Sequence, residues 1–216
     1  MPTQRVELST LSSAQLQELY GALEQFTRTQ RLSRPVVALT VVHWDDTVSS
    51  VPTDVSVVRG HYSINHDSDE FFAHHRRYLA EVEAYLAARN FSYAPGGRIP
   101  WWDPAKPMPA PFGQALQPGV DCYTAGRLDN NCDWESGAFA TDFPGMPMPS
   151  RYQAGNICQQ FATLHDLVQD FLVYHDSLHN TVAGMFRSFD APAAPIFWAW
   201  HATVDDVYSN WLACGK

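Results

Sequence analysis

Apolar residues recur at helical spacing in several separate parts of the chain, which places them on one face of an α-helix in each part. The first such part runs from about Ser12 to Arg31. Its apolar positions are Leu16, Leu19, Tyr20, Leu23 and Phe26. Ser12 or Ser13 can cap the first turn, with Gln15 or Gln17 nearby. This pattern predicts an amphipathic helix over residues 12–31.

Histidines lie on the apolar faces of two later helices. The first of these is predicted from Ser68 to Arg89, and His75 falls on its apolar stripe. That stripe consists of Phe71, Phe72, Tyr78, Leu79, Val82, Tyr85 and Leu86. In the second helix, His175 and His179 share the apolar face. The other members of that face are Phe161, Leu164, Val168, Phe171, Leu172, Leu178 and Val182. An inward imidazole needs partners for its ring nitrogens, so the two helices together suggest a shared metal site.

The spacing of His175, His179 and His201 is suited to a metal ion. Because His175 and His179 are four residues apart, a helix places both imidazoles on one side, one turn apart. His201 follows and opens a further helical pattern. That pattern continues through Val204, Val207, Tyr208 and Trp211. Three neutral imidazoles can bind one copper or zinc ion. The alternative without a metal is two surface histidines and one core histidine.

Two regions break the helical pattern. Residues 36–44 are apolar and β-branched, and this composition favours a strand. Prolines and glycines are concentrated from Phe91 to Tyr152, among tryptophans and phenylalanines. Such dense prolines exclude long helices, whereas the aromatic residues argue against disorder. We expect an ordered loop segment that wraps the helical core, rather than a second domain.

Composition and charge narrow the function classes. The chain has 216 residues, 45% of them hydrophobic and 13% aromatic, which fits one domain with a substantial core. The net charge of -9 argues against a nucleic-acid or anionic-membrane partner. No apolar run approaches the roughly 20 residues that cross a bilayer. The first residues lack the apolar core of a signal peptide, so we expect a cytoplasmic protein, or one exported with a partner.

Four motifs surround the histidines. His66 to Leu79 reads H-x8-H followed by R-x-Y-L, and Gly97–Asp103 reads G-R-I-P-W-W-D. His175–Gly184 reads H-D-S-L-H-N-T-V-A-G, and Pro195–Trp211 begins P-I-F-W-A-W-H. Taken in this order, they resemble the motifs of the type-3 copper family, which includes tyrosinases and catechol oxidases. The resemblance covers most of the chain.

The resemblance implies a mainly α fold: a single domain over residues 1–216, with a four-helix core that holds a dinuclear copper site inside the long loop segment. It also implies six ligands, three for each copper ion: His43, His66 and His75 for one, and His175, His179 and His201 for the other. In the family, the segment at 36–44 is a short helix that carries the first ligand, and we adopt this over the strand. His61 stays open as an alternative to His43, because it lies five residues before His66.

The implied function is a dicopper oxidoreductase that uses O2 to oxidise phenols, o-diphenols or o-aminophenols to o-quinone-type products. Six neutral imidazoles would favour O2 bound as a bridging peroxide. Two other classes stay open: a dioxygen-binding protein without turnover, like the hemocyanins, and a zinc or iron hydrolase that uses one histidine trio. The implied partners are a small phenolic substrate and a copper-loading or pocket-plugging protein. In many relatives, a C-terminal domain or a separate small protein blocks the pocket until copper is loaded. For this chain we expect that such a domain has been removed, that a partner protein takes its place, or that the pocket is open.

This chain departs from the family around the histidines. Trp200 replaces the first of two consecutive histidines, His74 replaces a tryptophan, Asp176 replaces an asparagine and Ala194 replaces an aspartate. In relatives, an acidic residue and that asparagine hold a water that takes the phenol proton. Asp166, nine residues before His175, is the corresponding acidic residue here. Asp166 and Asp176 are therefore the predicted catalytic carboxylates, and a solvated helix residue is the alternative for Asp166.

Two further pairings are predicted. Arg76 directly follows His75, and Asp205 lies one helical turn after His201, so we expect an ion pair between them, with two separate surface charges as the alternative. The cysteines form an even set in which Cys122 can pair with Cys132, and Cys158 with Cys214. Unpaired buried thiols are the alternative for a cytoplasmic chain.

Overall fold

The computed structural model describes residues 5–33, 69–112, 122–124, 127–129, 143–183, 186, 191 and 194–216, and these are mainly α-helical, as predicted. The α-helices are α1 (Ser13–Ser33), α3 (Phe71–Ala87), α4 (Ala154–Gln160), α5 (Leu164–Val182) and α6 (Pro195–Leu212). Short 3-10 turns are η1 (Leu8–Thr10), η4 (Pro95–Gly97) and η5 (Ser150–Tyr152). Strand β1 (Cys122–Thr124) pairs antiparallel with β2 (Arg127–Asp129).

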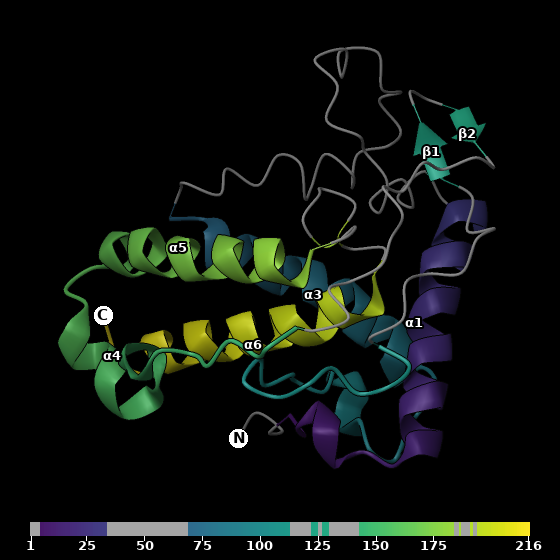
Figure 1. Ribbon diagram of the computed structural model, residues 1–216, viewed down its shortest axis with the longest axis horizontal. Coiled ribbons are helices and arrows are strands. Elements are labelled where there is room, and N and C mark those ends of the chain that lie inside the picture. Colours follow the sequence, from purple (N-terminus) through teal and green to yellow (C-terminus); the bar gives the residue numbers. More distant parts are fainter. Residues whose placement is uncertain are drawn as a thin grey trace.

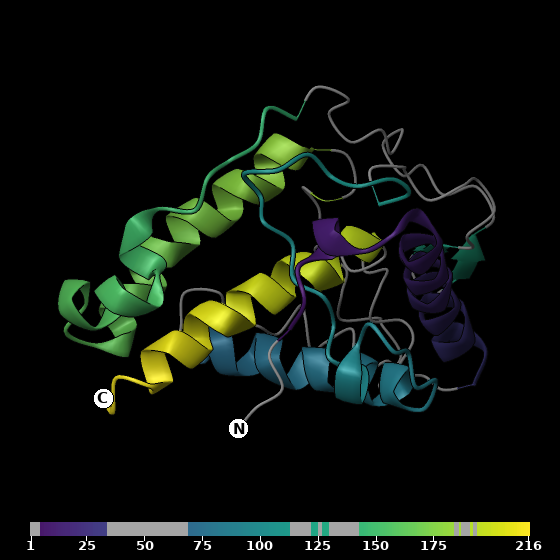
Figure 2. The ribbon, with the colours of Figure 1, turned by 90° about the horizontal axis from the view of Figure 1, so that it is seen from below.

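Helix α6 is the central element. Figure 1 shows α5 and α6 side by side, with α3 behind them and α1 standing across one end. In Figure 2, which views the molecule from below, α6 lies between α5 and α3. Every side chain in residues 195–205 is buried. This agrees with a sequence that is apolar on nearly all sides of the helix, because only a helix with neighbours all round can bury such a surface.

Local sequence signals explain where the helices begin. Ser12 and Gln15 form reciprocal side-chain to backbone hydrogen bonds before α1, as the capping prediction required. Thr163 and Asp166 form the same kind of capping box at α5. Helix α6 begins at Pro195, whose missing N–H is no loss in a first turn. It therefore starts six residues before His201, which was predicted to open it.

Several described residues of the loop segment contact the helices. Trp102 donates its backbone N–H to Ala199 O at 3.1 Å and accepts from the Thr203 hydroxyl at 2.6 Å, which ties it to α6. The Tyr174 hydroxyl on α5 donates to Met146 O at 2.7 Å. Gly97 has a φ of +77°, and a Cβ there would lie 2.2 Å from Glu83 O, so only glycine allows this approach to α3.

A buried ion-pair cluster joins the N-terminal segment to α3 and α6. Asp205 on α6 accepts from Arg76 Nε at 2.5 Å, which confirms the predicted pair, and from Arg5 Nη2 at 2.8 Å. Arg5 also donates to Glu83 on α3, which accepts from Arg98 Nη1 at 3.2 Å. The side chains of Arg5 and Asp205 are 1% and 3% exposed. The cluster thus fixes α3 against α6.

Two smaller findings complete the fold. A disulfide joins Cys158 at α4 to Cys214 beyond α6, as one of the two predicted pairings had it. The side chains of Cys122 and Cys132, and the predicted helix at 36–44, lie outside the described residues. Among the described residues, no helix combines the length and apolar character that a membrane crossing requires.

Candidate metal centre

Three histidines from three helices meet in the core. His75 on α3, His175 on α5 and His201 on α6 are all buried, and each offers a ring nitrogen within 4.8 Å of the other two. The rings of His75 and His201 are stacked, with centroids 4.5 Å apart and an interplanar angle of 18°. The Nε2 atoms of His175 and His201 are 3.3 Å apart. Helix periodicity turned each histidine inward, and the packing of the helices brought them together.

His179 lies beside this trio. One turn after His175 on α5, its ring centroid is 4.5 Å from that of His175 and 5.6 Å from that of His201. Its Nδ1 is 2.7 Å from Phe186 O, and its ring stacks on the Phe186 ring at 4.2 Å. The role of Phe186 could not be predicted from the sequence, because nothing in the local pattern shows that its carbonyl oxygen reaches His179.

Each of the four histidines has its Nδ1 against an oxygen atom. His75 Nδ1 is 2.8 Å from Phe71 O, and His201 Nδ1 is 2.8 Å from Phe197 O. His175 Nδ1 is 2.9 Å from Asp176 Oδ1. Carbonyl and carboxylate oxygens only accept, so each Nδ1 carries the proton and donates it. In its neutral form, each ring then has its lone pair on Nε2, the atom left for a metal ion.

This donor set fits a metal ion such as copper. The Nε2 atoms of His175 and His201 face each other at 3.3 Å, and two lone pairs at that distance repel unless a cation lies near them. Burial lowers the pKa of His201 well below its ordinary value, and the neighbouring His75, His175 and His179 lower it further. A neutral imidazole is the form that binds copper or zinc. His75, His175 and His201 thus present nitrogen ligands in the buried core, with the half-buried His179 beside them.

The remaining predicted ligands are His43 and His66, and the alternative is His61. All three lie outside the described residues. The second half of the dinuclear site therefore stays a prediction, and the structure brings together His75, His175, His179 and His201 from the predicted set.

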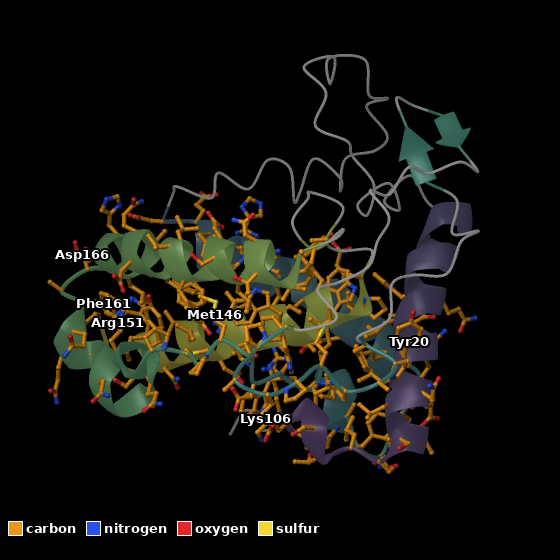
Figure 3. The ribbon with its side chains drawn as sticks, viewed as in Figure 1. Tyr20, Lys106, Met146, Arg151, Phe161 and Asp166 are labelled. Atoms are coloured by element: carbon orange, nitrogen blue, oxygen red, sulfur yellow. A yellow bond between two sulfur atoms is a disulfide. The ribbon has the colours of Figure 1, made fainter. Side chains whose placement is uncertain are left out.

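The structure places Asp166 far from the histidines. Its carboxylate accepts from the backbone N–H of Thr163 at 3.0 Å and from the Thr163 hydroxyl at 2.7 Å, and these bonds lower its pKa. Figure 3 labels it at the end of α5 that adjoins α4. Nine residues are about 2.5 helical turns, so Asp166 lies on the face opposite His175. This fully exposed position does not favour the predicted role as a base beside the metal ions.

The other departures from the family have different surroundings. Trp200 is fully buried, and its ring lies roughly parallel to His175, with centroids 6.1 Å apart. His74 faces away from the cluster, with its Nδ1 3.8 Å from the exposed carboxylate of Glu70. Ala194 is the buried residue before α6. Of these positions, Trp200 and Asp176 contact a histidine of the centre.

Comparison with known proteins agrees with this geometry. A family model described as the common central domain of tyrosinase matches residues 35–142 and 127–213. The first match includes α3 with His75, and the second includes α5 and α6 with the other three histidines. Comparisons with curated proteins and with solved structures give no match. Membership of this family implies copper. The matches span most of the chain, which therefore belongs to the tyrosinase family.

Proposed function

We propose that the protein is a dicopper oxidase that uses O2 to oxidise phenols, o-diphenols or o-aminophenols to o-quinone-type products. The observation that carries this proposal is the convergence of His75, His175, His179 and His201 within a tyrosinase domain. His175, His179 and His201 would hold one copper ion. His75 would hold the other, together with His43 and His66.

The surrounding side chains support such chemistry. Bound copper would supply the electron exchange between O2 and the phenol. The protein would supply fixed ligands and a dry site. Phe71 lies edge-on to His175 at 5.1 Å, and Phe197 lies against His201 at 3.8 Å between centroids. These buried rings exclude water from one side of the cluster, and each Nδ1 bond holds its imidazole in one orientation.

The proposed preference is for o-diphenols and o-aminophenols over monophenols. A monophenol, with a pKa of about 10, must lose its proton as it reaches the metal, and this needs a nearby base. Asp166 caps α5 and is fully exposed, so the proposal does not rely on it as that base. Asp176 is the carboxylate beside the cluster, and it contacts His175. A copper-loading or pocket-plugging partner protein stays a prediction from the resemblance.

The test is copper content and O2 consumption by the copper-loaded protein with catechol, 2-aminophenol and tyrosine. The proposal expects two copper ions per chain and turnover of the first two substrates. Two copper ions with reversible O2 binding and no turnover would indicate a dioxygen-binding protein. Zinc or iron as the only retained metal would indicate a hydrolase.

His179→Ala sharpens the test. It should leave about one copper ion per chain and abolish turnover, because it removes one ligand of a trio. His165→Ala is the matched control, since His165 is on the same helix but 60% exposed and paired with Asp69. The control should keep both copper ions and full activity. Equal losses in the two variants would contradict the assignment of His179.

A further inference from the structure

His175 differs from the other three histidines in what holds its Nδ1. His75, His179 and His201 each donate to a backbone carbonyl oxygen. His175 donates to a side chain, the Asp176 carboxylate, at 2.9 Å. Backbone carbonyls are present whatever the sequence, whereas this acceptor depends on one residue. A substitution at position 176 can therefore change a ligand without touching the ligand itself.

The contact is not a default of helix geometry. Consecutive residues on a helix do not face each other, and here the ring is 4% exposed while the carboxylate is 64% exposed. Asp176 must turn back along the helix surface to meet the buried ring. The stacked Trp200 and the edge-on Phe71 restrict the tilt of His175. These two aromatic rings do not determine which nitrogen of His175 carries the proton, whereas the Asp176 carboxylate does.

The charge of the acceptor has a further consequence. A hydrogen bond to a carboxylate is roughly twice as strong as one to a neutral acceptor. A carboxylate behind a metal-binding histidine also raises the basicity of the ligand. With the proton held on Nδ1, the Nε2 lone pair of His175 points toward His201, whose Nε2 is 3.3 Å away.

We propose that Asp176 is a positioning residue for His175, fixing its Nδ1–H tautomer and ring orientation and strengthening its binding of one metal ion. The part of this proposal that concerns metal affinity rests on the proposed copper site, whereas the part that concerns the tautomer does not. It gives Asp176 a role other than base. It also assigns a consequence to the aspartate that replaces the family asparagine: an amide would keep an acceptor oxygen but not the charge.

Three variants separate these effects. Asp176→Ala removes the acceptor, Asp176→Asn keeps an acceptor oxygen without the charge, and Asp69→Asn is the control. Asp69 is an exposed aspartate that also contacts a histidine, His165, outside the centre. Because Asp176 is exposed, we expect all three to fold, which circular dichroism checks.

The first measurement uses the metal-free protein. Nitrogen-15 NMR of the imidazoles should show His175 as the Nδ1–H tautomer in the wild type and in Asp176→Asn. In Asp176→Ala, the tautomer should become mixed. An unchanged His175 tautomer in Asp176→Ala would overturn the inference, whatever the protein does with copper.

The second measurement is copper(I) affinity by competition with a coloured chelator. In Asp176→Ala, one of the two bound equivalents should weaken about 10- to 100-fold, as is usual when such a partner is lost. Asp176→Asn should weaken it less, and Asp69→Asn should not change it. Wild-type affinity in Asp176→Ala would refute the positioning role while the proposed function stands. A wild type that binds no copper would refute the proposed function, and the tautomer measurement would still decide the role of Asp176.

Discussion

Helix α6 meets α3 through ion pairs as well as aromatic rings, whereas it meets α5 through aromatic rings. On the α3 side, Asp205 accepts hydrogen bonds from Arg5 and Arg76. On the α5 side, Trp200 lies roughly parallel to Phe171, with centroids 6.3 Å apart, and edge-on to Tyr174. Both interfaces border the same histidines. The two interfaces should nevertheless differ in how much stability is lost when one of their side chains is replaced.

The physical difference is what remains after a substitution. A buried ion pair that loses one partner leaves an unpaired charge, which is far more costly than the pair was favourable. An aromatic contact that loses some carbon atoms leaves a smaller apolar surface and a cavity that neighbours can partly fill. A substitution at the α3 interface should therefore lower the free energy of unfolding more than one at the α5 interface.

The largest effect is expected from Asp205→Leu, which takes the shared carboxylate away from the buried Arg5 and the half-buried Arg76. The free energy of unfolding should fall by about 3–5 kcal/mol, measured by urea denaturation of the metal-free protein. Asp206→Asn is the adjacent comparison, because that carboxylate also lies 3.4 Å from Arg5 Nε but its side chain is 42% exposed. If Asp205→Leu lowers the free energy of unfolding no more than Asp206→Asn does, the α3 interface does not depend on this carboxylate.

A smaller effect is expected from Phe171→Leu on the α5 side. Phe171 is fully buried against Trp200 and Tyr152. Leucine keeps most of the apolar volume, so the free energy of unfolding should fall by about 1–2 kcal/mol. The measurement is the same urea transition, with exposed Val173→Ala on the same helix as the control. A loss as large as that of Asp205→Leu would contradict the expected difference between the two interfaces.

The smallest effect concerns pH at the edge of the charged interface. Burial raises the pKa of Asp206 to about 6, although Arg5 pulls it down. Because the folded state holds this proton more tightly than the unfolded chain, stability from this group is present at low pH and is lost as pH rises through about 6. Solvent screening of this partly exposed group keeps the change below roughly 1 kcal/mol.

Asp206→Asn should remove that pH dependence. The stability of the wild type relative to the variant should decline between pH 4 and about 6, the interval between the ordinary and the raised pKa. Thermal unfolding at closely spaced pH values measures it. A stability difference that stays constant, or that grows with pH, would show that burial does not raise the pKa of Asp206.

The helices could be predicted from sequence because their signals are local. The stripe and the capping serine placed a helix at 12–31, and α1 covers Ser13–Ser33. The stripe with His75 placed another at 68–89, and α3 covers Phe71–Ala87. Every residue that decides these elements lies within a few turns of the others. The ion pair of Arg76 and Asp205 was predictable for another reason: both flank motifs that resemble those of the family.

Asp166 shows how a local signal was available and not used. The order Thr163, two residues, Asp166 before an apolar helix is the pattern of a capping box. Asp166 was instead predicted to act as a base, because it occupies the position of the acidic residue that holds a water in relatives. Nine residues turn the side chain to the face opposite His175, so the structure gives that role no support, and it stays a prediction.

The sequence by itself determined most of the helical segments, that His75 and His175 are buried on inward faces, and that the chain has the motifs of a copper protein. The short helix α4 was not predicted. Only the tertiary structure decided which atoms meet. Phe186 supplies the acceptor for His179, and Arg5 reaches Asp205 from 200 positions away. His175 and His201 bring their Nε2 atoms to 3.3 Å from different helices. The physical reason is range: periodicity sets the direction of each side chain within its helix, whereas these contacts depend on how whole helices pack.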